Sequence, residues 1–194
     1  MAALVLVLGA LGGTSVPARA AEERSPWVIQ LGFAAYNFGR TASQPTGEKS
    51  FFGPTEPFLI GATWRSPYSN GWAFEPTVTL GLIGRGAGDS AGRWRTFGFL
   101  FPFVTPGSFA FSMGPGVIFS IFTGAGGTSV LNNGNTTTTF YLPAGTTVTT
   151  NVVLSTGFVA WFSDTLRMDM NLLYFGLLSS RRAVGMLLEV GYAI

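Results

Sequence analysis

The strongest constraint on this chain is a two-residue alternation of side-chain type, which is typical of β-strands with two different faces. Leu166 and Met168, for example, alternate with Arg167 and Asp169. Large apolar residues therefore lie on one face, and small, polar or charged residues lie on the other. The pattern predicts eight strands, over residues 27–38, 57–65, 72–83, 94–103, 109–122, 148–162, 166–175 and 184–194.

The connections between these segments alternate in length. Short turn sequences occupy residues 67–71, 105–108 and 163–165, and longer segments occupy 39–56, 84–93, 123–147 and 176–183. Short turns join antiparallel strands, because parallel strands need long crossovers. The sequence therefore predicts an antiparallel up-and-down arrangement with short turns at one end and long loops at the other.

Composition indicates which face meets which solvent. The chain is 47% hydrophobic and only 10% charged, whereas globular proteins have about 25% charged residues. It has no apolar run of the roughly 20 residues that a membrane helix needs. The interior of an eight-stranded barrel is only just wide enough for side chains to fill. We therefore predict a transmembrane barrel whose apolar face is on the outside, with bulky residues facing lipid and small or polar residues filling the lumen.

Two further patterns fit such a barrel. Aromatic residues recur beside the short turns or the chain ends, where they would form a ring at one membrane interface; they are Trp27, Trp64, Trp72, Phe103, Phe109, Phe162 and Tyr192. The sequence Asn-Asn-Gly-Asn at residues 132–135 is typical of a hairpin tip. The strands on either side of it are expected to rise above the membrane as a ribbon.

The N-terminus predicts a secretory signal peptide. A short apolar stretch is followed by Ala18-Arg19-Ala20, a small-x-small cleavage signal. The alternative is a buried first strand. We expect residues 1–20 to be the signal peptide and residues 21–194 to form the barrel domain.

On these grounds residues 27–194 resemble the small eight-stranded outer-membrane barrels of the OmpA, OmpX and OmpW type. The resemblance is architectural and selects no single family. It implies location in the outer membrane of a Gram-negative-type cell, with the short turns in the periplasm and the long loops outside. It also implies recognition by the barrel-assembly machinery through the C-terminal strand, although the last residue is Ile194, where an aromatic residue is usual.

The residue inventory argues against several classes of function. The chain has no histidine and no cysteine, so a serine nucleophile lacks its usual base and a thiolate metal site is absent. We expect a protein that is not an enzyme and has no cofactor and no metal. The net charge is only +2, which gives no indication of nucleic-acid binding.

Charged residues on the predicted inner face gather toward the short turns. Burying a charge is costly unless it is paired, so we expect an ion-pair network across the lumen, acting as a plug or only as filling. Its expected members are Arg65, Glu75, Arg167, Asp169 and Glu189.

The inner face becomes apolar toward the long loops. The predicted residues there are Tyr36, Phe38, Leu59, Ile83, Ile118, Phe122, Leu173, Phe175 and Leu187. Because glycines accompany them, a cleft for a small hydrophobic ligand is one interpretation, and OmpW-like barrels are similar in having such a funnel. The first functional hypothesis is therefore a narrow conduit or binder of small hydrophobic molecules. The alternative is a structural or surface-interaction barrel with no transport activity.

Basic residues on the predicted outer side suggest contact with lipopolysaccharide phosphates, which guanidinium groups bind well. They are Arg40, Lys49, Arg85, Arg93, Arg95, Arg181 and Arg182. Ordinary surface charge is the alternative interpretation.

Overall fold

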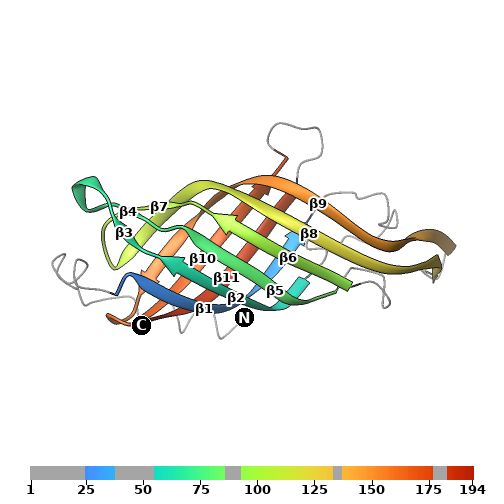
Figure 1. Cartoon of the computed structure of the whole chain (residues 1–194), viewed down its shortest axis with the longest axis horizontal. Coiled ribbons are helices and arrows are strands. Elements are labelled where there is room, and N and C mark those ends of the chain that lie inside the picture. Colours follow the sequence, from blue (N-terminus) through green and yellow to red (C-terminus); the bar gives the residue numbers. More distant parts are fainter. Residues whose placement is uncertain (1–24, 38–54, 86–92, 133–136, 177–182) are drawn as a thin grey trace.

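The computed structural model describes residues 25–37, 55–85, 93–132, 137–176 and 183–194. Its strands form one antiparallel sheet closed into a barrel (Figure 1). The barrel closes because the first strand, β1 (Trp27–Asn37), pairs with the next strand, β2 (Thr55–Trp64), and also with the last strand, β11 (Ala183–Ala193). The other elements are β3 (Ser66–Pro67), the 3-10 turn η2 (Ser69–Gly71), β4 (Ala73–Phe74), β5 (Thr77–Arg85), β6 (Arg93–Leu100), β7 (Phe103–Val104), β8 (Phe109–Asn132), β9 (Thr137–Trp161) and β10 (Leu166–Phe175).

Proline explains why some barrel strands are divided into two labelled pieces. A proline has no N–H to give to the ladder, and Pro76 and Pro102 stand between β4 and β5 and between β6 and β7. Their carbonyls still accept hydrogen bonds, from Trp64 N at 3.0 Å and Glu75 N at 2.9 Å. The pieces therefore continue as single strands, and the predicted antiparallel eight-stranded barrel is confirmed.

The short connections are tight turns, as the sequence predicts. Asn70 and Gly71 adopt positive φ values of 58° and 77° in the turn between β3 and β4, a conformation that asparagine and glycine tolerate. In the β9–β10 turn, Ser163 Oγ accepts hydrogen bonds from the backbone N–H groups of Thr165 and Leu166. The short turns and the C-terminus lie at the left-hand end of Figure 1.

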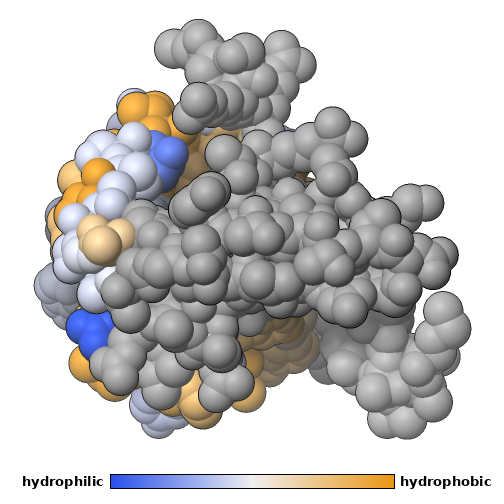
Figure 2. All heavy atoms as spheres, turned by 90° about the vertical axis from the view of Figure 1, so that its right-hand side faces the viewer, coloured by the Kyte–Doolittle hydropathy of each residue, from blue (hydrophilic) through white to orange (hydrophobic). Residues whose placement is uncertain are grey.

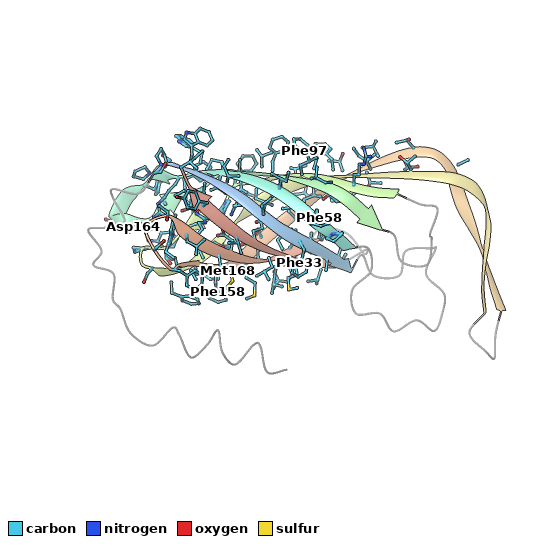
Figure 3. All side chains as sticks on the ribbon, turned by 90° about the horizontal axis from the view of Figure 1, so that it is seen from below. Phe33, Phe58, Phe97, Phe158, Asp164 and Met168 are labelled. Carbon is cyan, nitrogen blue, oxygen red and sulfur yellow. The ribbon has the colours of Figure 1, made fainter. Side chains whose placement is uncertain are left out.

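The large apolar side chains lie on the outside of the barrel. Leu31 and Phe58 are 64% and 61% exposed, and in Figure 3 Phe97 and Phe158 project outward from opposite sides of the barrel. Apolar residues are also visible on the described part of the outer wall seen from the long-loop end (Figure 2). All seven residues of the predicted aromatic ring are exposed beside the turns: Trp27, Trp64, Trp72, Phe103, Phe109, Phe162 and Tyr192. No helix in the described residues is long and apolar enough to cross a membrane.

Strands β8 and β9 are much longer than the others, at 24 and 25 residues. They pair with each other out to Asn132 and Thr137, which confirms the predicted ribbon. Among the described residues, their pairing with β6 and β10 stops earlier, at Thr123 and Val153. The paired strands therefore continue beyond the rest of the barrel, and they extend to the right in Figure 1.

Candidate functional site

The lumen is filled by three layers of side chains. An apolar layer nearest the short turns contains Val28, Val104, Ala110, Val159, Trp161 and Ala193. A second apolar layer, here called the upper cluster, contains Ala34, Tyr36, Leu59, Leu100, Ile118, Val153, Leu173, Phe175, Ala183 and Leu187. A polar layer built around buried charged residues separates the two.

Arg167 is the centre of the polar layer. Its Nε and Nη2 donate to the two carboxylate oxygens of Asp169 at 2.8 and 2.7 Å, and its Nη1 donates to Glu75 Oε2 at 2.8 Å. Arg65 Nη1 donates to the other Glu75 oxygen at 2.5 Å. This two-pronged recognition of carboxylates suits the planar guanidinium group.

The pairing of Arg167 with Glu75 crosses the barrel. Arg167 lies on β10, and Glu75 lies between β4 and β5, on the strand opposite β10 in the closed sheet. Alternation explains why both point inward. Residues of the same parity along a strand share a face, and each of the two shares the parity of the inward residues of its own strand. The structure thus brings together four of the five residues that the sequence places in a lumen charge network.

Neutral side chains extend the network. Gln30 donates from Nε2 to Asp169 Oδ2 at 2.6 Å and accepts at Oε1 from Thr63 Oγ1 at 2.7 Å. The hydroxyls of Thr63 and Thr77 are 2.8 Å apart. Sequence reasoning concentrated on charges and omitted these residues, although their inward parity was a usable signal. Together they tie β1, β2, β5 and β10 through the lumen.

Trp161 was also missed. It lies on the inner face of β9, 5% exposed, and its ring centroid is 5.2 Å from Arg167 Cζ. A guanidinium group over an indole ring is a favourable cation–π contact. By its residue type, Trp161 would be expected in the belt of aromatic residues at the membrane interface. It instead supports the ion pairs from inside the barrel.

Glu189 is the exception in the charge network. The residue is 1% exposed, and its Oε1 has no hydrogen-bond partner among the described residues. It forms none of the ion pairs that the described residues make with Arg65 and Arg167. A cavity of about 10 Å³ adjoins it, lined also by Gln30, Glu75, Thr77, Ser112, Arg167, Asp169 and Asn171.

The upper cluster occupies the region where the sequence suggests an apolar cleft. Leu59, Leu173 and Leu187 are each 1% exposed or less, and the rings of Tyr36 and Phe175 meet edge to face at 6.0 Å. Tyr36 Oη also lies 3.2 Å from the Thr96 hydroxyl. Of the other predicted members, Ile118 is buried in the cluster, and the side chains of Phe38, Ile83 and Phe122 lie outside the described part of the structure.

Glycine 185 gives a test of how full this region is. A Cβ added there would lie 2.8 Å from Tyr36 Cδ1 and 3.1 Å from Phe175 Cε2. We expect Gly185→Leu to destabilise the barrel by about 1–3 kcal/mol, because it overpacks the interior. Urea unfolding in lipid vesicles measures this, with Val184→Leu on the outer face as the neighbouring control. Equal stability of the two variants would mean that the upper lumen is open.

The other predicted sites are only partly described. Arg95 is exposed at the outer end of β6, as contact with lipopolysaccharide would require. The side chains of Arg40, Lys49, Arg85, Arg93, Arg181 and Arg182 lie outside the described residues, as does the predicted signal peptide over residues 1–20. Among the described residues, no cluster of three His, Cys, Asp or Glu side chains is arranged to hold a metal ion.

A closed barrel with an apolar outer wall, an interfacial aromatic ring and a polar layer sealed inside defines a small transmembrane β-barrel of the outer-membrane class. Comparison with solved structures supports this fold. Neisserial surface protein A has a TM-score of 0.50 at 10% identity, over 88% of this chain and 98% of that one.

Two other solved structures are also similar. Ail, the attachment invasion locus protein of Yersinia pestis, matches at 14% identity over 88% of this chain and 99% of its own, with a TM-score of 0.49. The N-terminal β-barrel domain of Pseudomonas aeruginosa OprF matches at 14% identity over 89% and 100%, with a TM-score of 0.46. No protein-family model and no curated protein sequence matches the chain.

Proposed function

We propose that this protein is a surface-interaction barrel, in which a filled lumen anchors the β8–β9 hairpin outside the membrane. The observation that carries the proposal is the length of β8 and β9, which far exceeds the 9–11 residues or so that a strand needs to cross a bilayer. From Thr123 to Asn132 the hairpin extends roughly 30 Å beyond its last pairing with the described residues of β6, at about 3.3 Å per residue.

The hairpin offers a strand edge to a partner. Among the described residues, β9 from Thr137 to Val152 pairs only with β8, since its pairing with β10 begins at Val153. Unpaired N–H and C=O groups on such an edge are a template for another strand. The side chains of residues 144–150 are exposed, and four of these are threonine. The partner that fits is an extended polypeptide segment.

A synthetic strand tests this proposal directly. The probe is a peptide with the sequence of residues 124–132, which already pairs with β9 inside the hairpin. We expect saturable binding to vesicles that contain the full protein. Binding should be lost when residues 124–145 are replaced by an Asn-Gly turn, and when Ser129→Pro is introduced into the peptide. Equal binding to the full and shortened proteins would contradict pairing along the hairpin.

The conduit hypothesis needs space that buried side chains occupy. A path through the barrel has to pass Leu59 and Leu187 in the upper cluster and then the Arg167–Glu75 ion pair. We therefore favour the surface-interaction role over passage or binding of a small hydrophobic molecule. Uptake of a small apolar dye by liposomes containing the protein, compared with empty liposomes, tests that alternative.

Contacts with lipopolysaccharide and with the barrel-assembly machinery remain predictions. Arg95 is the described residue that supports the first, because its exposed guanidinium group suits phosphate. The C-terminal strand β11, whose outer residues Val190 and Tyr192 are exposed, supports the second. We also retain the prediction that the protein has no enzymatic activity, since Glu75, Asp169 and the two lumen arginines are held in structural ion pairs.

A further inference from the structure

The charges of the polar layer do not balance. Two guanidinium groups, from Arg65 and Arg167, face three carboxyl groups, from Glu75, Asp169 and Glu189. The two guanidinium groups are committed to Glu75 and Asp169 at 2.5–2.8 Å. One carboxyl group, that of Glu189, is left over.

The fold makes a closed space for this carboxyl group. Gly32 on β1 lies opposite Glu189, and a Cβ there would come within 2.7 Å of Glu189 Cγ. A Cβ at Gly61 on β2 would lie 2.9 Å from Glu189 Oε1 and 3.0 Å from Gln30 Oε1. Glycine at both positions therefore admits the Glu189 side chain, and Glu189 Oε1 and Gln30 Oε1 both lie within 3.0 Å of the Cβ position at Gly61.

We propose that Glu189 binds one proton in the folded barrel, so that the polar layer is electrically neutral. A buried carboxylate with no partner is far more costly than the neutral acid, and the neutral acid supplies an O–H donor for nearby acceptors. The adjoining cavity of about 10 Å³ is close to the size that holds one water molecule.

The surroundings of Glu189 are consistent with one bound proton. From β10, Asp169 lies opposite it in register, with Arg167 beside the shared cavity. Glu75 lines the same cavity from between β4 and β5. β1 and β2 contribute the neutral Gln30, Gly32 and Gly61. Arg65 contacts Oε1 of Glu75, and Arg167 contacts the Oε2 atom.

The proton has a thermodynamic consequence. An unfolded glutamic acid is ionised near neutral pH, so unfolding releases the proton that the folded barrel holds. Stability then falls as pH rises, and the unfolding equilibrium constant increases about tenfold per pH unit on account of this one group. This contribution is lost once the pH is high enough to ionise Glu189 in the folded state.

The experiment compares the wild type with Glu189→Gln in lipid vesicles. Infrared difference spectra should show a carboxylic-acid C=O band at neutral pH that the variant lacks. Urea unfolding should show the tenfold-per-unit pH dependence in the wild type relative to Glu189→Gln. Asp164→Asn, an exposed carboxyl-to-amide change in the β9–β10 turn, should retain both the band and the dependence.

Two results would overturn the proposal. One is a wild-type spectrum at neutral pH without a band assignable to Glu189. The other is a stability that follows sodium concentration, and not pH, in a Glu189-dependent way, because a bound cation would then supply the missing charge. If Glu189→Gln failed to fold, isotope-edited spectra of the wild type alone would still decide between the acid and the carboxylate.

Discussion

Replacing Arg167 by methionine should destabilise the folded barrel by about 3–5 kcal/mol, the largest effect that we expect from one substitution. The methionine fills much of the same space but leaves Asp169 without its paired guanidinium and Glu75 without the interaction across the barrel. Both carboxyl groups are 1% exposed or less, so water does not replace the lost partner. Reversible urea unfolding in lipid vesicles measures the change.

Two controls separate the ion pairs from packing. Arg95→Met removes an exposed arginine and should alter stability by no more than roughly 0.5 kcal/mol. The double variant Arg167→Met, Asp169→Asn removes the stranded carboxylate together with the arginine and leaves Glu75 paired with Arg65. It should be more stable than Arg167→Met alone, because breaking a buried pair costs more than replacing all of it. A single variant as stable as the wild type would mean that the network lies in contact with water.

Arginine placed at Val78 should destabilise the barrel by about 2–4 kcal/mol, the cost of a basic residue on the lipid face near mid-membrane. Val78 is 39% exposed, and its neighbours in register are Ala62 on β2 and Phe99 on β6. The same assay in bilayers measures the loss.

The matched control is Ala144→Arg, which places the same side chain at an exposed site on the hairpin beyond the rim. Water solvates the arginine there, so we expect a change of roughly 0.5 kcal/mol or less. Equal effects at the two positions would show that the wall around Val78 does not face lipid.

The alternation of residue types predicted most of the barrel because side-chain facing is a local property. Parity along β10 alone placed Arg167 and Asp169 inside and Met170 and Leu172 outside, as the structure has them. One exception is Ala35, which shares parity with the outward residues but is 5% exposed. It lies next to a register irregularity between Gly32 and Ala34, where strict alternation ends.

Contacts across the lumen were beyond this kind of reasoning. The ion pair from Arg167 to Glu75 joins residues 92 positions apart, and which inward residues meet depends on the register of every strand between them. The same limit applied to Trp161, whose position beneath Arg167 follows from the packing of the closed barrel. The lack of a partner for Glu189 was likewise visible only after the two arginines had been placed.

The proposed role of the barrel as an anchor depends on a closed lumen. Conductance of the purified protein in planar lipid bilayers tests it most directly, with bilayers lacking protein as the baseline. We expect no channel events above that baseline, because the upper cluster and the Arg167 network obstruct the barrel in succession. Reproducible single-channel steps that change in size with Arg167→Met would contradict it and establish a pore through the polar layer.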